Sequence, residues 1–304
     1  MSEPDSESDG KFQPKRNLAE AKFYEAKFRQ AQVELMGEST LPAGTTIMAA
    51  ERPPCIAVRN LTMAFGSFVV MRDMNFTVRR GDVFVIMGGS GCGKSTLLRH
   101  MIGLIEPAAG EICYGDFNFT KAGPEERERM LRRFGVLYQA GALWGSMTLA
   151  ENVGLPLEEF TDLAPKEIRQ IAALKLALVG LKGFEDFYPS QISGGMQKRA
   201  GLARAMALDP EILFCDEPSS GLDPLSSRLL DNLILDLRDN LGATVVVVSH
   251  ELASIFAIGN NSVFLDAESR TMIASGDPKE LLAHCADPRV HRFLTRDEEQ
   301  GRTA

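Results

Sequence analysis

The sequence predicts an α/β fold in which helices connect the strands of a parallel sheet. Residues 83–87 form a fully apolar run that ends in glycines, as a buried parallel strand does. Apolar runs at 212–215 and 244–248 indicate two more such strands, and shorter runs at 56–58 and 76–78 indicate strands near the start. Helical spacing of apolar residues covers 95–102, 166–179, 195–207 and 226–240, so strands and helices alternate.

Composition limits the classes of protein to which the chain can belong. Its 304 residues allow about two globular units, and 44% apolar residues exclude a wholly disordered protein. The net charge of −8 argues against a nucleic-acid-coating role, and we expect no nucleic-acid partner. No apolar run approaches the roughly 18 residues of a membrane span, and residues 1–10 lack the apolar core of a signal peptide. The five cysteines are widely spaced, which predicts a reducing compartment without disulfides or a zinc site.

The chain divides into five predicted segments. Residues 1–16 are acidic and polar and are expected to be disordered. Residues 17–36 predict an amphipathic helix that packs on its own domain, docks on a partner or lies on an anionic membrane surface. A linker over 37–55 contains Gly and Pro and precedes the main domain at 56–276, in which 141–200 is a helical insertion without strands. A C-terminal tail covers 277–304 and is a candidate partner or dimer contact.

A glycine-rich loop follows the strand at 83–87 and opens a helix, which is the context that a phosphate-binding loop requires. The match to GxxxxGK[ST] consists of Gly88, Gly89, Ser90, Gly91, Cys92, Gly93, Lys94 and Ser95, with Thr96 next. Its glycines let successive backbone N–H groups turn toward one phosphate chain, and the helix adds its positive end. We expect Lys94 to bridge the β- and γ-phosphates of a nucleotide, and the Ser95 hydroxyl to bind Mg²⁺.

A second strand, 212–215, leads into two acids, Asp216 and Glu217. Asp216 is placed to hold the Mg²⁺ shell, and Glu217 is placed to polarise a water molecule for attack on the γ-phosphate. A solvated strand end would be the simpler interpretation of two acids alone. The phosphate loop upstream makes the catalytic interpretation the stronger one.

Further motifs resemble those of ABC ATPases, in their usual order. Ser193, Gly194, Gly195, Met196 and Gln197 resemble the ABC signature, although Met196 stands where many members have Gln. Gln139 resembles the Q-loop glutamine, Ser220 to Asp223 the D-loop, and His250 the switch histidine. The resemblance covers about 56–276. It implies a RecA-like core sheet with a helical subdomain and an antiparallel β subdomain, and hydrolysis of ATP with Mg²⁺.

The ABC resemblance also implies roles for these residues in a head-to-tail homodimer. Glu217, His250 and Gln139 would be catalytic, and Ser95, Gln139 and Asp216 would hold the metal. The nucleotide would lie between the phosphate loop of one chain and Ser193, Gly194, Gly195, Gln197 and Asp223 of the other. Phe65 is our choice for the aromatic ring that stacks on adenine, with Phe68 as the alternative and a core position as the simpler role for either.

A narrower resemblance concerns the residues around the Q-loop, 139–152, the signature, 193–199, and the tail, 287–294. They are similar to MlaF-type ATPases of bacterial MCE lipid-transport systems. That family implies phospholipid transport, an MlaE-type permease, an MCE-domain (MlaD-type) protein, in some systems a STAS-domain (MlaB-type) protein, and a place on the cytoplasmic face of the inner membrane. The ATPase of another importer is an alternative. A soluble ABC protein or a non-hydrolysing scaffold is disfavoured by the single cassette and by Glu217 and His250.

Three local expectations remain. Leu143, Trp144, Met147 and Leu149 are candidates either for the groove that receives a permease helix or for the core of the insertion. Cys92 lies before a helix N-terminus, which lowers thiol pKa values, so we expect ready alkylation against which ATP protects. The segment 287–294 resembles a family tail that contacts the neighbouring subunit, and a helix on its own domain is the alternative.

Overall fold

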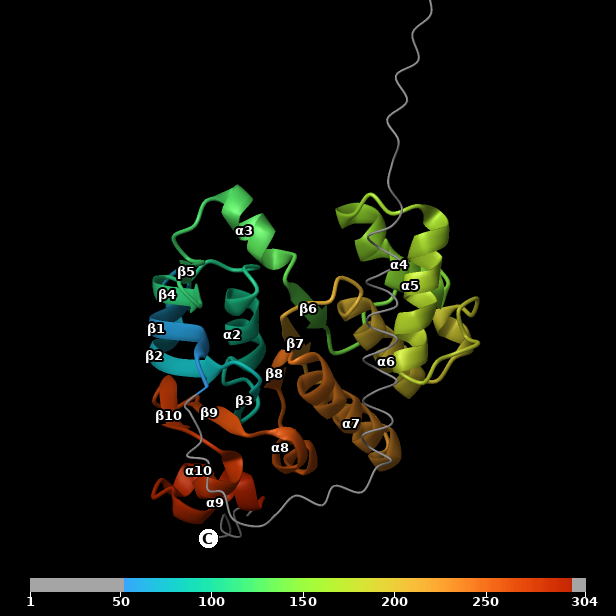
Figure 1. Ribbon diagram of the computed structural model, residues 1–304. Coiled ribbons are helices and arrows are strands. Elements are labelled where there is room, and N and C mark those ends of the chain that lie inside the picture. The colour runs from blue at the N-terminus through green and yellow to red at the C-terminus, as the bar shows by residue number, and fades with distance from the viewer. Residues whose placement is uncertain (1–51, 297–304) are drawn as a thin grey trace, which may run out of the picture. The chain divides into compact units, whose positions relative to one another are not determined.

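Two β-sheets and the helices that pack around them make up the fold of the computed structural model, which describes residues 52–296 (Figure 1). The segments predicted at 1–16 and 17–36 lie outside the described residues, as do most of the linker and positions 297–304 of the tail. Within 52–296, no helix is both long and apolar enough to cross a membrane. All five cysteines are free thiols.

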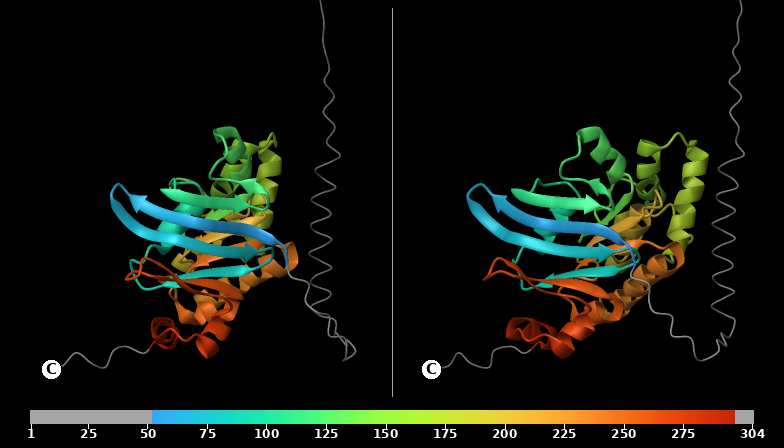
Figure 2. Two further views of the ribbon diagram at one scale, coloured as in Figure 1. Left: turned by 90° about the vertical axis from the view of Figure 1, so that its left-hand side faces the viewer. Right: turned by 60° about the vertical axis from the view of Figure 1, so that its left-hand side comes forward.

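The first sheet is antiparallel and has the strand order β2-β1-β4-β5. Its strands are β1 (Pro54–Phe65), β2 (Phe68–Arg79), β4 (Ala109–Tyr114) and β5 (Phe117–Asn118). The strands predicted at 56–58 and 76–78 are parts of β1 and β2, which are much longer than expected. Register shifts interrupt the alternation of buried and exposed residues in this pair, so the sequence pattern revealed only fragments. Figure 2 shows the long β1–β2 hairpin as part of this sheet.

The second sheet has the order β10-β9-β3-β8-β7-β6. Its strands are β3 (Val83–Gly88), β6 (Phe134–Leu137), β7 (Ile212–Asp216), β8 (Thr244–Val248), β9 (Asn261–Asp266) and β10 (Thr271–Ser275). All neighbouring pairs are parallel except β10 with β9. The predicted strands at 83–87, 212–215 and 244–248 are confirmed and form the centre of the sheet. Strands β6, β9 and β10 were missed because they are short or mix polar and apolar residues.

Four helices confirm the predicted ones to within two residues at either end: α2 (Lys94–Met101), α5 (Pro165–Leu178), α6 (Gly194–Ala205) and α7 (Pro224–Leu241). The sequence did not predict α3 (Pro124–Leu131), α4 (Leu149–Phe160), α8 (Leu252–Ile258) or α9 (Pro278–His284), and a helix was one of two alternatives for the segment that forms α10 (Pro288–Thr295). The region 141–200 contains helices and no strand. These elements confirm the predicted core sheet, helical subdomain and antiparallel β subdomain.

The six-stranded sheet is covered on both faces. Helix α2 packs between the two sheets through Leu97 and Leu98, against Phe84 of β3. Helices α6 and α7 pack on the opposite face, and α4 and α5 pack against α6, so that Leu202 of α6 and Val247 of β8 belong to one buried cluster. A third cluster joins β9 to α8 and α10. Because α2 and α6 lie on opposite faces, the phosphate loop and the signature segment are well separated within one chain (Figure 1).

The predicted C-terminal segment forms α10 on its own domain. Val290 and Leu294 are buried against the third cluster, and Phe293 packs edge-on against Phe264 with ring centroids 5.1 Å apart. Asp287 caps the helix, and Arg289 bonds to the carboxylates of both Asp287 and Asp266. This arrangement supports the alternative of a terminal helix on its own domain. A contact with a neighbouring subunit stays a prediction.

Candidate active site

The loop between β3 and α2 has a backbone that only glycine can follow at several positions. At Gly88, φ is +146°, and a Cβ atom would lie 2.3 Å from the carbonyl oxygen of Leu265. Gly91 and Gly93 also have positive φ, and Gly93 caps α2 without any side-chain hydrogen bond. The helix therefore presents its first N–H groups to the loop, where an anion can accept from them.

Lys94 holds this loop closed. Its side chain is buried, and Nζ donates to the carbonyl oxygens of Gly88 at 3.0 Å and Gly89 at 2.8 Å. Burying an ammonium group without an anionic partner costs free energy, because the charge loses its hydration. The two neutral carbonyl oxygens offset only part of this cost. A phosphate oxygen would supply the missing negative charge at this position.

Ser95 and Asp216 come from neighbouring elements and are bonded to each other. Ser95 Oγ donates to Asp216 Oδ1 at 2.9 Å. Burial raises the pKa of Asp216, and the hydrogen bond from Ser95 acts in the opposite direction. A hydroxyl and a carboxylate oxygen in contact are hard ligands of the kind that Mg²⁺ prefers. No cluster of three or more His, Cys, Asp or Glu side chains suited to a metal ion occurs within 52–296.

Glu217, His250 and Gln139 converge at the ends of three parallel strands. His250 Nδ1 lies 3.0 Å from Glu217 Oε1, and Gln139 Nε2 donates to Glu217 Oε2 at 3.3 Å. Glu217 has φ of +47°, a left-handed conformation that is uncommon for a residue with a side chain. Its N–H donates to the carbonyl oxygen of Val248 at 2.9 Å, which ties the strained residue to the end of β8. The three residues assigned to catalysis thus meet around one carboxylate.

Phe65 and Phe68 face each other at the tip of the β1–β2 hairpin. Both rings are exposed, Phe65 by 53% and Phe68 by 59%. The guanidinium of Arg270 lies over the ring of Phe68, 5.3 Å from its centroid. Neither residue belongs to the core. Phe65 is the better candidate for stacking, because the Arg270 guanidinium already covers one face of Phe68.

The signature and D-loop residues lie at the start of α6 and α7. Ser193 Oγ accepts from the N–H of Met196 at 3.3 Å, and Asp223 caps α7 through the N–H groups of Leu225 and Ser226. A Cβ atom at Gly194 would meet no other atom within 4 Å, whereas one at Gly195 would lie 3.1 Å from Ser226 Oγ. The amide of Gln197 donates to the carbonyl of Pro189 at 2.9 Å, so its side chain fixes the preceding loop. Among the described residues, no hydrogen bond joins Ser193, Gly194 or Gly195 to the phosphate loop.

The hypothesis that Cys92 is reactive is wrong for the free protein. Its side chain is 2% exposed, and burial raises the pKa of the thiol rather than lowering it. The Cβ position of Gly88 would lie only 2.8 Å from Cys92 Sγ, which shows how closely the loop encloses the sulfur. Desolvation therefore outweighs both the helix N-terminus and nearby Lys94, the influences that favour a thiolate.

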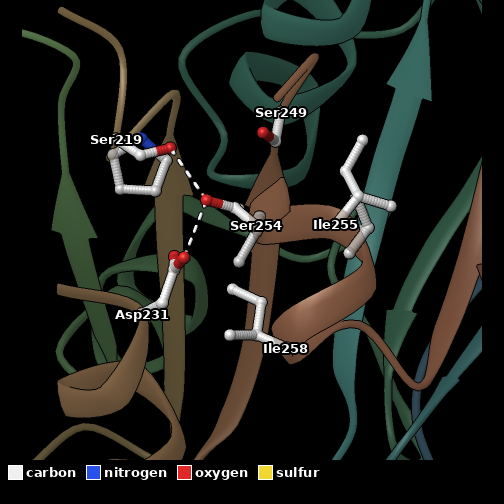
Figure 3. A pocket seen from close by; sticks show the side chains of 9 residues that line it. Ser219, Asp231, Ser249, Ser254, Ile255 and Ile258 are labelled. Atoms are coloured by element: carbon white, nitrogen blue, oxygen red, sulfur yellow. Dashed lines mark hydrogen bonds between the residues drawn. The ribbon is translucent and has the colours of Figure 1, made fainter. Parts of the chain in front are cut away.

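Sequence reasoning missed a buried polar network formed by Ser219, Asp231 and Ser254. Ser254 Oγ lies 2.8 Å from Asp231 Oδ2 and 3.3 Å from Ser219 Oγ, and Figure 3 shows Ser254 between these two side chains. The pocket that the three residues line is too tight to admit a water molecule. Asp231 Oδ1 is buried without a hydrogen-bond partner in the described part of the chain, and burial raises the pKa of Asp231. Nothing in the spacing of these residues predicted their contact.

Lys198 of α6 was also missed. Its side chain is 7% exposed, and Nζ donates to the carbonyl oxygen of Ser220 and lies 3.5 Å from that of Glu217. In the sequence it is simply a basic residue after the signature. Only the packing of α6 against the end of β7 reveals it.

Comparison with known proteins places this site in a family. A sequence model described as "ABC transporter" matches residues 71–220. The chain is 42% identical over 239 residues to the "Probable ribonucleotide transport ATP-binding protein mkl" of Mycobacterium tuberculosis (strain ATCC 25618 / H37Rv), which covers 79% of this chain. The match spans 66% of the mycobacterial protein, just under two thirds of its length.

A shorter relative and a solved structure complete the comparison. The "Intermembrane phospholipid transport system ATP-binding protein MlaF" of Haemophilus influenzae is 38% identical over 239 residues, or 79% of this chain and 89% of that protein. The dimeric post-hydrolysis structure of the ATP-binding cassette MJ0796 with ADP and Pi has a TM-score of 0.65 and 28% identity, and it covers 73% of this chain and 98% of its own. The chain therefore belongs to the family of ABC transporter ATP-binding proteins.

Proposed function

We propose that this protein hydrolyses ATP as a head-to-tail homodimer to drive phospholipid transport between the membranes of a bacterial envelope. The observation that carries the proposal is the similarity to MlaF, which extends over 89% of that protein's length. The intact convergence of Glu217, His250 and Gln139 supports hydrolysis rather than a regulatory role.

Hydrolysis would use the groups that meet at the strand ends. Lys94 and the N–H groups of the phosphate loop bind the phosphates, and Glu217 accepts a proton from the attacking water. His250 orients the Glu217 carboxylate, and it would face the γ-phosphate of a bound nucleotide. Ser95, Asp216 and Gln139 would hold Mg²⁺, which when bound neutralises charge that develops on the phosphates. The oxygen donors of Ser95 and Asp216 fit this ion.

The second half of each site would come from a partner chain. Gly194 stands at the start of α6 with open space around it, and Ser193 caps that helix. A helix N-terminus with free approach is suited to an anion such as the γ-phosphate. The dimeric cassette MJ0796 supports such pairing. Phe65 would stack on adenine, because the Arg270 guanidinium already covers one face of Phe68.

A permease would dock on the helical insertion beside the Q-loop. Trp144 is 59% exposed, whereas Leu149 is fully buried in the core of the insertion. Asn152 is buried and donates to the carbonyl oxygens of Trp144, Met147 and Thr148, so one side chain shapes the loop that carries the indole. The proposed partners are an MlaE-type permease, an MCE-domain protein and a small STAS-domain protein, at the cytoplasmic face of the inner membrane.

Ribonucleotide transport is a second candidate, because the relative named for it has the higher identity of the two. It would keep the same ATPase chemistry and the same docking surface. The two candidates differ in the cargo and in the membrane partners.

Purification of the native complex from solubilised membranes would test the proposal. Mass spectrometry should find an MlaE-type permease, an MCE-domain protein and bound phospholipid. The variant Trp144→Asp should lose the permease, while Leu104→Asp, an exposed leucine in another layer, should retain it. A different permease with bound ribonucleotide would overturn the lipid assignment, and recovery without any membrane protein would overturn the transport role.

A further inference from the structure

Lys198 is a buried cation to which the proposed chemistry assigns no role. The part of the chain at 52–296 contains three buried lysines, namely Lys94, Lys175 and Lys198. Lys94 belongs to the phosphate loop, and Lys175 forms an ion pair with Asp209. Within the described residues, no carboxylate lies within ion-pair distance of Lys198, and burial lowers its pKa. A buried ammonium group held only by neutral carbonyls is costly, which calls for a functional reason.

The two carbonyls that Lys198 faces belong to a single tight turn. Ser220 N–H donates to the carbonyl oxygen of Glu217 at 3.2 Å, so residues 217–220 form a turn between β7 and the D-loop. Lys198 Nζ donates to the carbonyl oxygen of Ser220 and stands 3.5 Å from that of Glu217. One ammonium group therefore lies close to both the first and the last carbonyl oxygen of the turn.

This turn carries the strained residue of the site. Glu217 has φ of +47°, and its N–H is fixed by Val248 at 2.9 Å. Lys198 lies next to the carbonyl at the other end of the same residue. With both peptide groups of Glu217 restrained, the direction of its carboxylate is restrained too.

Helix α6 connects Lys198 to the rest of the site. Lys198 follows Gly194 by one helical turn, so it lies on the same face of α6 as the start of the signature. Further along α6, Arg204 donates to the carbonyl oxygens of Gly141 at 3.1 Å and Ala142 at 2.6 Å, in the loop that follows Gln139. The same helix thus holds both the segment after Gln139 and the turn after Glu217.

We propose that Lys198 is a positioning residue that couples helix α6 to the turn at 217–220 and thereby sets the direction of the Glu217 carboxylate. The proposal rests on the catalytic role given to Glu217 above. The hydrogen bonds of Lys198 go to backbone carbonyls, so we expect it to act through Glu217 and not on the nucleotide. A partner's nucleotide bound at the start of α6 would therefore be linked to the Glu217 carboxylate through this contact.

Steady-state ATP hydrolysis by the full-length protein would test the proposal. In Lys198→Met, which keeps the length of the side chain and removes the charge, kcat should fall by about tenfold or more, with KM for ATP changed less than about threefold. Lys198→Arg should recover part of the loss, because a guanidinium can also donate to two carbonyls. Lys198→Gln is a second uncharged variant in case the methionine form fails to fold.

Lys175→Met is the matched control, since it removes a lysine of similar burial from the helical insertion. It should keep kcat within about twofold of the wild-type value. A wild-type kcat in Lys198→Met or Lys198→Gln, while Glu217→Gln is inactive, would overturn the role of Lys198 alone. Equal losses in the Lys175 and Lys198 variants that follow their melting temperatures would also overturn it. Full activity in Glu217→Gln would overturn the assignment of Glu217 itself, and the present inference with it.

Discussion

The imidazole of His250 and the carboxylate of Glu217 meet at 3.0 Å, although 33 positions separate them in the chain. The contact follows from the sheet, since Asp216 at the end of β7 pairs with Val248 at the end of β8. Each residue stands just past its own strand, at the edge where the carboxyl ends of parallel strands gather.

Glu217→Gln tests the carboxylate as the proton acceptor. We expect kcat to fall by about 10²–10⁴-fold with ATP binding retained, because the amide keeps the shape and loses the basicity. Hydrolysis assays and equilibrium ATP binding on the same preparation would measure this. His250→Ala should also lower kcat while leaving binding near the wild-type value. Unchanged turnover in both variants would rule out the assigned pair.

Phe65→Ala and Phe68→Ala separate the two candidates for adenine stacking. Loss of an aromatic stacking partner costs about 1 kcal/mol, so Phe65→Ala should weaken ATP affinity by roughly five- to tenfold. Phe68→Ala should change affinity by less than about twofold, because that ring packs with Arg270. Titration with a fluorescent ATP analogue would decide between them, and the reverse order of effects would exchange the two roles.

Gly194→Ala tests the dimeric site without disturbing the monomer. Space around Gly194 is open, so the added methyl group should leave the melting temperature unchanged. Hydrolysis should nevertheless fall, since the methyl group would occupy the approach of a partner's γ-phosphate. Gly135→Ala provides the contrast, because its Cβ would lie 2.3 Å from the carbonyl oxygen of Ala205 and should destabilise the fold. Full activity in Gly194→Ala would argue against the sandwich arrangement.

Thiol labelling should reveal a single accessible cysteine among the five. Cys285 is partly exposed, whereas Cys55, Cys92, Cys113 and Cys215 are buried. Burial also raises the pKa of each of these four thiols. N-ethylmaleimide followed by peptide mass spectrometry should label Cys285 first and Cys92 only after unfolding. Rapid labelling of Cys92 in the native protein would restore the reactive-thiol hypothesis.

Asp231→Asn should stabilise the protein at neutral pH. Burial raises the pKa of Asp231 in the folded state, so folding favours the protonated form. Stability is therefore highest below the unfolded pKa of about 4 and is lost as pH rises through the folded pKa. The neutral amide avoids this loss, and we expect a gain on the order of 1 kcal/mol at pH 7.5.

Thermal melts of Asp231→Asn across the pH range would measure that gain. The difference from the wild type should shrink as the pH is lowered toward 4. Asp162→Asn, which changes an exposed carboxylate, should show no comparable pH dependence. A gain that persists undiminished at low pH would contradict the stated cause.

Features that depend on neighbours along the chain can be predicted from the amino-acid order alone. The run at 83–87, the glycines after it and Lys94 specify a strand, a loop and a helix in succession, and the structure has β3 and α2 there. The order of Gln139, Ser193, Asp216 and His250 identified the ABC family before any coordinates. Strands such as β6 and β9 carry weaker local patterns, and their place in the sheet comes from parallel neighbours far away in sequence.

Properties that depend on burial and on distant partners follow from the packing of the folded chain. A helix N-terminus predicted a reactive Cys92, but enclosure by the loop and the sheet raised its pKa instead. Lys198 meets the turn at 217–220, and Ser254 meets Asp231, only because helices from separate parts of the chain pack on one sheet. The free energy of a charged or polar group depends on the dielectric and the partners that surround it, and packing alone sets both.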